Sequence, residues 1–164
     1  KSLWEARMAF YTWTEAMSVG VSLLDSDHRA LIDAINRLHD QVEGDGKPSI
    51  LEEIFDELIA YTEFHFAREE KVMAVCEFPP AKSHQEEHAS FTQCIYDLRE
   101  RHAKDPSPAM MHDLLHYRKD WLNHHILIQD MAYKAFAEGN EDADEVARMF
   151  GPGLADVRKV SESV

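Results

Sequence analysis

Hydrophobic residues recur every three or four positions along most of this chain, a period that predicts helices rather than strands. In the first such stretch, Leu31, Ile32, Ile35, Leu38 and Val42 form one apolar face. The stretches with this period are residues 26–43, 49–76, 81–103 and 108–137. The pattern therefore predicts four helices and no sheet.

Residues that favour helix ends mark the boundaries of these stretches. Asp25 or Asp27 can cap the first helix, which a Gly-Asp-Gly sequence at residues 44–46 brings to an end. Pro48 opens the second helix, and a pair of prolines at 79–80 stops it. Four helices with short connections predict an all-α fold, an antiparallel up-down four-helix bundle.

The two ends of the chain depart from this periodicity. Residues 1–21 have no sustained period, and we expect this N-terminal arm to pack across the bundle through its aromatic residues, Trp4, Phe10, Tyr11 and Trp13. Residues 138–164 form an acidic C-terminal extension after a bundle domain of residues 1–137.

The C-terminal extension has two interpretations. Val146, Met149 and Phe150 can form a short amphipathic helix that packs on the bundle. Alternatively the extension is a linker to an output domain or partner, because a near-heptad spacing relates Phe150, Val157, Val160 and Val164.

Composition narrows the classes of function. A chain of 164 residues with 45% hydrophobic residues can bury one sizeable core, and only 6 glycines and 6 prolines suit helices. A net charge of −14 argues against nucleic acid and anionic membranes as partners. No apolar run is long enough for a membrane span and no signal peptide is visible, so we expect a cytoplasmic protein. Cys76 and Cys94 form no Cys-x-x-Cys pair and are expected to be free thiols.

Metal-ligating residues recur in a fixed order, one group in each predicted helix. They are His28, His65, Glu69, His84, His88, His125 and Asp130. Two groups have the four-residue spacing that stacks side chains on one helix face. Burial of so many imidazoles and carboxylates without metal would leave charges uncompensated, and the donor count suits two metal ions bridged by carboxylate. Asp130, however, lies about 140° round an ideal helix from His125, so spacing alone does not put them on one face.

A second histidine series lies on the opposite side of the fourth helix. Its members, at four-residue steps, are His112, His116, Asp120 and His124. Beside Lys119 and Asn123 these residues are typical of a solvated polar face, although an adventitious surface site for zinc or nickel stays open. The chain contains no Glu-x-x-His pair, which argues against a carboxylate-rich di-iron protein. Gln85 stands where a zinc protease of the His-Glu-x-x-His type needs its general base.

Four segments resemble the ligand segments of the bacterial hemerythrins, in the same order and at the same spacings. The first is Trp13-Thr14-Glu15-Ala16-Met17-Ser18-Val19-Gly20-Val21 with Asp25-Ser26-Asp27-His28, and the others are His65-Phe66-Ala67-Arg68-Glu69-Glu70, His84-x3-His88 and Trp121-Leu122-Asn123-His124-His125-Ile126-x3-Asp130. The resemblance covers residues 13–136 and fills all seven ligand positions of that family.

This resemblance implies a di-iron site with an oxo or hydroxo bridge. One iron would be held by His84, His88 and His125, and the other, with an open position, by His28 and His65. Glu69 and Asp130 would bridge the irons. The resemblance places Leu122 beside bound dioxygen, with Ile126, Phe66 and Ile32 as further apolar neighbours. For these three neighbours the alternative role is ordinary packing in the core. The ligand types alone would also accept manganese, cobalt or zinc.

The function implied by the resemblance is reversible binding of dioxygen for transport, storage or delivery, without enzymatic activity. One alternative is an oxygen- or redox-sensing module of a larger signalling protein, with residues 138–164 leading to the output domain. The other is a di-iron enzyme that consumes peroxide.

Overall fold

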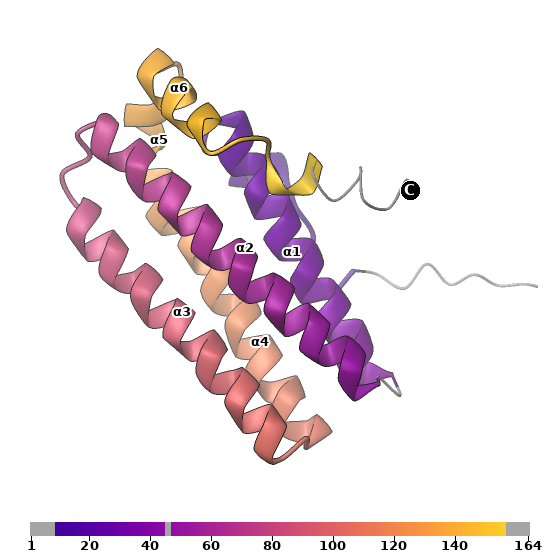
Figure 1. Cartoon of the computed structure of the whole chain (residues 1–164). Coiled ribbons are helices and arrows are strands. Elements are labelled where there is room, and N and C mark those ends of the chain that lie inside the picture. Colours follow the sequence, from indigo (N-terminus) through magenta and orange to yellow (C-terminus); the bar gives the residue numbers. More distant parts are fainter. Residues whose placement is uncertain (1–8, 45–46, 157–164) are drawn as a thin grey trace, which may run out of the picture.

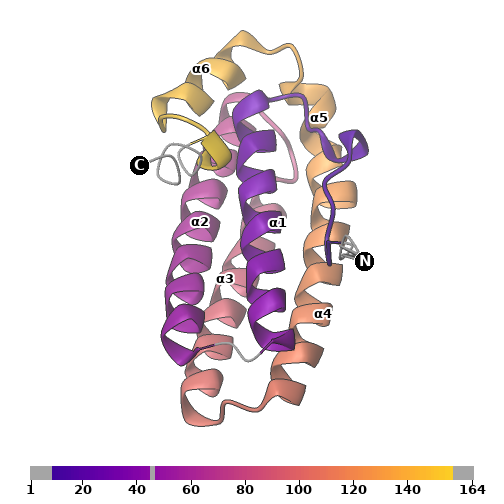
Figure 2. The same ribbon diagram turned by 90° about the vertical axis from the view of Figure 1, so that its right-hand side faces the viewer.

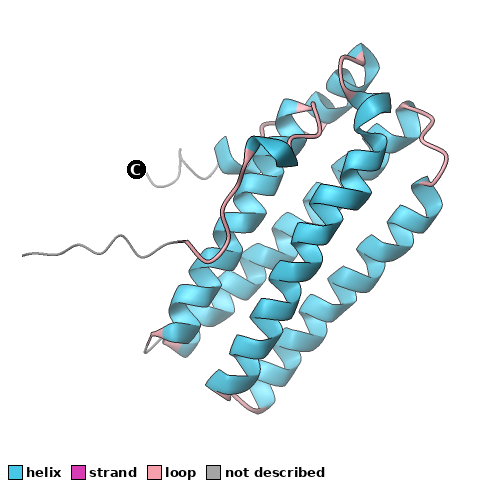
Figure 3. Ribbon diagram, turned by 180° about the vertical axis from the view of Figure 1, so that it is seen from behind, coloured by secondary structure: helices cyan, strands magenta, loops and turns pink. Residues whose placement is uncertain are grey.

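Four long helices run side by side in alternating directions (Figure 1). The computed structural model describes residues 9–44 and 47–156, and within these ranges all regular structure is helical (Figure 3). The long helices are α1 (Ser22–Glu43), α2 (Pro48–Val75), α3 (Ala81–Lys104) and α4 (Pro108–His124). The contacts of α1 with α2 and α4, and of α2 with α3, are those of an up-down bundle, which confirms the predicted fold class.

The start of α1 differs from the prediction. The helix begins at Ser22, and no side chain caps it. Asp25 lies inside the first turn, where it accepts hydrogen bonds from the Val19 N–H at 2.9 Å and from the Ser18 hydroxyl at 2.6 Å. Asp27 is fully buried and pairs with Arg68. The prediction that Asp25 or Asp27 caps the helix is therefore wrong, because the helix starts upstream of both residues.

The fourth predicted helix is interrupted by a π-helical segment. After α4 the chain continues as η2 (His125–Asp130), a π-helix, and then as α5 (Met131–Ala137). In a π-helix each N–H bonds to the carbonyl five residues back, so residues five apart come close to alignment. The predicted extent, residues 108–137, is confirmed, whereas the π segment was not predicted.

Two hydrophobic clusters lie on either side of a buried polar layer. Along α1 the order is Leu24 in one cluster, then His28, then Ile32 in the other cluster. Along α2 the order is reversed, with Phe66 before Glu69 and Met73 after it. Apolar packing above and below therefore holds the polar side chains in place.

The described part of the N-terminal arm packs on the bundle as predicted. Tyr11 is 4% exposed, and its N–H donates to the Asn36 side-chain oxygen at 2.8 Å while the Asn36 amide donates to the Tyr11 carbonyl at 2.8 Å. A short 3-10 helix, η1 (Glu15–Met17), follows before α1. Trp4 lies outside the described residues.

The described part of the C-terminal extension, residues 138–156, is called the C-terminal segment below. It returns across one end of the bundle, where α6 (Glu141–Met149) packs on α1 and α2 (Figure 2). Ala143 and Ala147 of α6 are buried, and the small side chains allow this close approach. The predicted C-terminal helix is present, but Met149, expected on its apolar face, is 78% exposed, because Ala143 and Ala147 form the side that packs on the bundle. Val157, Val160 and Val164 of the near-heptad lie outside the described residues. Within residues 9–44 and 47–156, no helix has the length and hydrophobicity needed to cross a membrane.

Candidate metal centre

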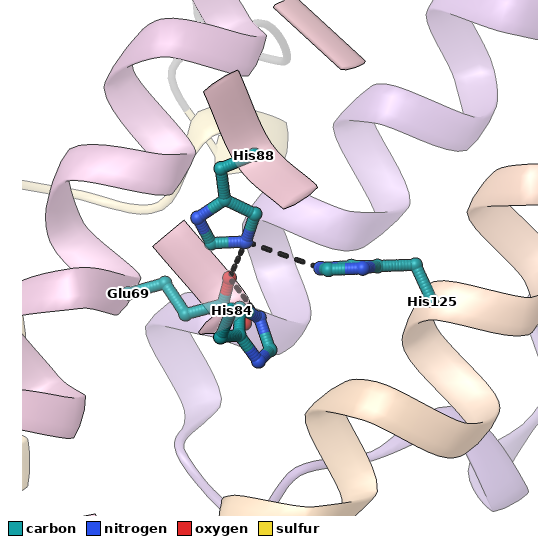
Figure 4. A group of neighbouring side chains, drawn as sticks. All are labelled: Glu69, His84, His88 and His125. Carbon is teal, nitrogen blue, oxygen red and sulfur yellow. Dashed lines mark hydrogen bonds and ion pairs between the residues drawn. The ribbon is translucent and has the colours of Figure 1, made fainter. Parts of the chain in front are cut away.

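All seven sequence-predicted ligand residues come together in the polar layer between the two hydrophobic clusters. They reach it from α1, α2, α3 and η2, and none is more than 3% exposed. Their side chains form two groups that could each hold a metal ion, one of Glu69, His84, His88 and His125 (Figure 4), the other of His28, His65 and Glu69. Within each group, one ligand-type atom per residue lies within 4.8 Å of the others.

Glu69 belongs to both groups. Its Oε2 lies 2.9 Å from His88 Nε2 and 3.6 Å from His84 Nε2 on one side. On the other side the same oxygen lies 3.8 Å from His65 Nε2. A single carboxylate on α2 therefore faces histidines of both groups.

Asp130 also faces both groups, with a different oxygen toward each. Its Oδ1 lies 3.1 Å from His125 Nε2 and 3.2 Å from His84 Nε2. Its Oδ2 lies 3.2 Å from His28 Nε2. The Asp130 carboxylate therefore lies between the two groups of potential metal ligands, with one oxygen directed to each group.

The carboxylates and imidazoles of the site shift one another's pKa values toward the charged forms. Burial by itself raises the pKa of Glu69, but the charge of His65 and hydrogen bonds from His84 and His88 hold it well below its usual range. Burial likewise lowers the pKa of His84, but hydrogen bonds and charge from Asp130 and Glu69 outweigh it and raise that pKa to about 10. Without a metal, ionised carboxylates and protonated histidines therefore compensate one another.

The donor set fits a pair of metal ions. Among the described residues, several atoms at the site are buried without a hydrogen bond of good geometry, including His28 Nε2, His84 Nε2, Glu69 Oε2 and both carboxylate oxygens of Asp130. Imidazole nitrogens and carboxylate oxygens are ligands for iron, manganese, cobalt and zinc, so two ions would satisfy these atoms together.

Three acidic residues lie beside the outer nitrogens of the histidines, and each of them belongs to a helix that precedes its histidine in the chain. Asp27 of α1 lies 3.4 Å from His65 Nδ1 of α2. In α2, Glu70 lies 2.9 Å from His88 Nδ1 of α3. The third, Glu87 of α3, lies 3.4 Å from His125 Nδ1 of η2. Hydrogen-bonded partners such as Asp27 and Glu70 fix the tautomer and the orientation of ligating imidazoles. Glu87 lies at ion-pair distance from His125 without forming a hydrogen bond.

The sequence analysis did not identify these three acids, although a signal exists. Each is the chain neighbour of a predicted ligand: Asp27 precedes His28, Glu70 follows Glu69, and Glu87 precedes His88. Each serves the imidazole of the following helix rather than its own neighbour, so only the packing of the bundle reveals its partner.

Tyr133 is a further residue that the sequence analysis missed. It is fully buried, and its hydroxyl donates a short hydrogen bond to Glu69 Oε1. Burial, together with the charges of Glu69 and Asp130, raises the pKa of Tyr133 well above its usual value. The phenol therefore stays protonated and acts as a donor to the carboxylate that both groups share.

The four apolar residues predicted around bound dioxygen, Leu122, Ile126, Phe66 and Ile32, lie together in the larger hydrophobic cluster. The Phe66 ring stacks on the His88 ring with centroids 3.7 Å apart and planes inclined by 5°. Trp121 stacks on His125 in the same way, at 4.6 Å and 12°. These contacts give the histidines an apolar wall, and its role toward dioxygen stays a prediction.

The second histidine series lies away from the site. All four of its residues, His112, His116, Asp120 and His124, are exposed, as a solvated polar face requires. The Nε2 atoms of His112 and His116 lie 3.2 Å apart, and Glu43 Oε1 lies 3.6 Å from His112 Nε2. The adventitious surface site for zinc or nickel stays a prediction.

Fold and site together define a metal-binding four-helix-bundle protein. The family model described as the hemerythrin HHE cation binding domain matches residues 19–137. The chain belongs to the hemerythrin family.

Individual relatives agree with this membership. A bacteriohemerythrin of Ralstonia nicotianae is 30% identical over 141 residues, which cover 85% of this chain and 98% of the relative. The bacteriohemerythrin of Stenotrophomonas maltophilia is 30% identical over 128 residues, covering 77% of this chain and 80% of that protein. Among solved structures, a hemerythrin mutant with one leucine replaced by alanine superposes with a TM-score of 0.71 at 27% identity, covering 80% of this chain and 100% of the solved chain.

Proposed function

We propose that this protein binds dioxygen reversibly at a carboxylate-bridged di-iron centre and serves as an oxygen carrier or store. The single observation that carries this proposal is the position of Glu69, whose carboxylate belongs to both groups of potential ligands. A carboxylate shared in this way suits two metal ions held side by side. The family of the chain and the names of its relatives, the bacteriohemerythrins, support the same function.

We assign the ligands as follows. One iron would be held by His84, His88 and His125, and the other by His28 and His65. Glu69 and Asp130, which each face histidines of both groups, would be shared by the two irons. The His28–His65 side has one imidazole fewer, which leaves room there for dioxygen.

When bound, the two irons supply the electrons for reversible binding of dioxygen. The side chains of the protein orient the ligands and limit the access of protons. Asp27 and Glu70 orient the imidazoles of two ligands, His65 and His88, through their outer nitrogens. Glu87 places a carboxylate 3.4 Å from the outer nitrogen of His125. Tyr133 directs its proton to Glu69, so the phenol is not a free proton donor at the site.

The apolar residues beside the site exclude water. Leu122 and Ile126 are 2% and 0% exposed, and Phe66 covers the face of His88. A dry, aprotic wall favours reversible binding, because a proton or water reaching the bound oxygen would promote its irreversible reduction. This wall supports a carrier over an enzyme that consumes peroxide.

The proposal includes a cytoplasmic setting, and its alternative is a sensing role. Cys76 and Cys94 are free thiols, as expected for a reducing compartment. Oxygen or redox sensing, with residues 138–164 leading to an output domain or partner, is the second candidate. The contact of the C-terminal segment with Asp27, a residue that supports His65, is the observation that favours it.

The test is anaerobic reduction of the purified protein followed by air, with metal analysis and visible absorption. We expect about two irons per chain, and an absorption band that appears with oxygen and disappears on deoxygenation. The variant His65→Ala should lose this reversible band, whereas His124→Ala, which alters an exposed histidine of the second series, should keep it. Zinc or no metal would overturn the proposal, and conversion to a stable oxidised form without the band would favour sensing.

A further inference from the structure

Arg68 connects the bundle to the C-terminal segment. It lies between His65 and Glu69 on α2 and is fully buried. Its Nη1 donates to both carboxylate oxygens of Asp27, at 2.9 and 3.0 Å. Its Nη2 donates to the carbonyl oxygens of Gly151 and Pro152, at 3.0 and 2.9 Å. One guanidinium therefore holds α1 and the returning chain at the same time.

Asp27 makes a second link to the same segment. Its Oδ1 accepts a hydrogen bond from the Leu154 N–H at 3.0 Å, while its Oδ2 lies 3.4 Å from His65 Nδ1. A single buried carboxylate thus joins the backbone of the C-terminal segment to the imidazole of a proposed iron ligand. Because Asp27 is buried, no water can replace a lost donor, and loss of either contact would raise the free energy of the folded protein.

The C-terminal segment fits against α1 without spare room. A Cβ on Gly153 would lie 2.2 Å from the Ser26 hydroxyl oxygen, so only glycine allows this approach. The backbone of residues 151–154 is therefore held at one distance from Asp27. This segment lies outside residues 19–137, the part of the chain matched by the family model.

We propose that residues 151–154 are positioning residues for the metal centre: they hold Asp27, which in turn orients His65. The inference rests on the proposed function, since it assigns His65 to an iron. It means that docking of the C-terminal segment and occupancy of the His28–His65 position stabilise each other, because a coupling free energy between two sites is reciprocal. A segment that only covered the bundle end through Ala143 and Ala147 would not show this coupling.

A substitution at Leu154 can remove the N–H, and a matched control accounts for the packing that is lost with the buried side chain. Residue 154 begins a helical turn, and proline is well accommodated as the first residue of a helix. The full-length variant Leu154→Pro therefore deletes the donor to Asp27, and Leu154→Ala is the matched control that loses side-chain packing but keeps the N–H. The readout is anaerobic release of ferrous iron to an excess of chelator. We expect Leu154→Pro to release one of its two irons about tenfold faster than Leu154→Ala, with the other iron unchanged.

Amide hydrogen exchange gives a readout that does not depend on oxygen binding. In the wild-type protein, exchange of residues 151–156 should slow when ferrous iron is added to metal-free protein. Residues 107–111, at the connection between α3 and α4, form the comparison segment and should change less. If Leu154→Pro fails to fold, Asp27→Asn takes its place, and faster iron release together with faster exchange of residues 151–156 is expected.

Two results would overturn the inference: equal release rates in Leu154→Pro and Leu154→Ala, or exchange of residues 151–156 that iron does not alter. With either result, a protein that still binds two irons and oxygen reversibly keeps the proposed function. A wild-type protein that binds no iron would overturn both.

Discussion

His125 Nε2 and Asp130 Oδ1 lie 3.1 Å apart although the two residues are five positions apart in the sequence. An ideal α-helix would turn them about 140° away from each other. The π-helical segment His125–Asp130 reduces this angle, because its wider turn brings residues five positions apart closer to alignment. The local departure from α-helix is thus what brings Asp130 to both groups of histidines.

Replacing Asp130 should remove iron. In Asp130→Ala the oxygens that face His125, His84 and His28 are lost, so we expect iron content to fall from about two per chain to about one or fewer. Asp120→Ala is the control, since Asp120 is exposed on the same chain segment. Two tightly held irons in Asp130→Ala would contradict the bridging role.

Removal of the Tyr133 hydroxyl should destabilise the metal-free protein. The variant Tyr133→Phe leaves Glu69 Oε1 without its buried donor, which we expect to lower the free energy of unfolding by about 1–3 kcal/mol. Tyr96 donates to Glu63 at 2.6 Å on the surface, so Tyr96→Phe should change stability little. Urea unfolding of both variants measures the difference, and equal losses would show that burial of the carboxylate is not the cause.

A proton donor beside the oxygen site should shorten the life of the oxygenated protein. Leu122 is 2% exposed within the apolar cluster, and Leu122→Tyr adds a hydroxyl there. We expect autoxidation to become faster by on the order of tenfold. Leu122→Phe adds the ring without the hydroxyl and serves as the control. If both variants autoxidise at the same rate, the extra volume rather than the proton is responsible.

Two glycines with positive φ should differ in their tolerance of alanine. Gly20 has φ of 80°, and a Cβ there would lie 2.7 Å from Glu138 side-chain carbons. Gly139 has φ of 73° but nothing within 4 Å of an added Cβ. Alanine at either position costs about 1–2 kcal/mol in backbone strain, and Gly20→Ala should lose about 1–3 kcal/mol more through the clash. Thermal unfolding checks this order, and a Gly139→Ala protein of lower stability than Gly20→Ala would refute it.

The metal-free protein should lose stability as the pH rises above neutrality. The pKa of His84 is raised from 6.5 to about 10 in the folded protein, so protonation of this group stabilises the fold fully below pH 6.5. That contribution is lost as the pH rises toward 10, with a slope of up to about 1.4 kcal/mol per pH unit. Melting temperatures of metal-free protein between pH 6.5 and 10 test this. A His84→Asn variant should have a shallower dependence, and an identical slope in both proteins would contradict the assignment.

Much of the architecture could be predicted from the sequence, because it depends on local spacing. The three- and four-residue period of apolar positions determines where helices form, and proline and glycine end them. The same period determines that His65 and Glu69, or His84 and His88, share a helix face. These regularities depend only on residues close together in the sequence, and the helices and helix faces of the structure agree with them.

What the sequence did not determine depends on packing between distant segments. The π segment that aligns Asp130 with His125, the pairing of Asp27 with His65, and the return of residues 151–154 to Asp27 are contacts that no local period specifies. Asp27, in particular, is an ordinary helix-capping residue by its sequence neighbourhood, yet it is fully buried. Local spacing thus decided which residues face inward, and only the tertiary structure decided which of them meet, because the energy of a buried charge depends on partners brought from other helices.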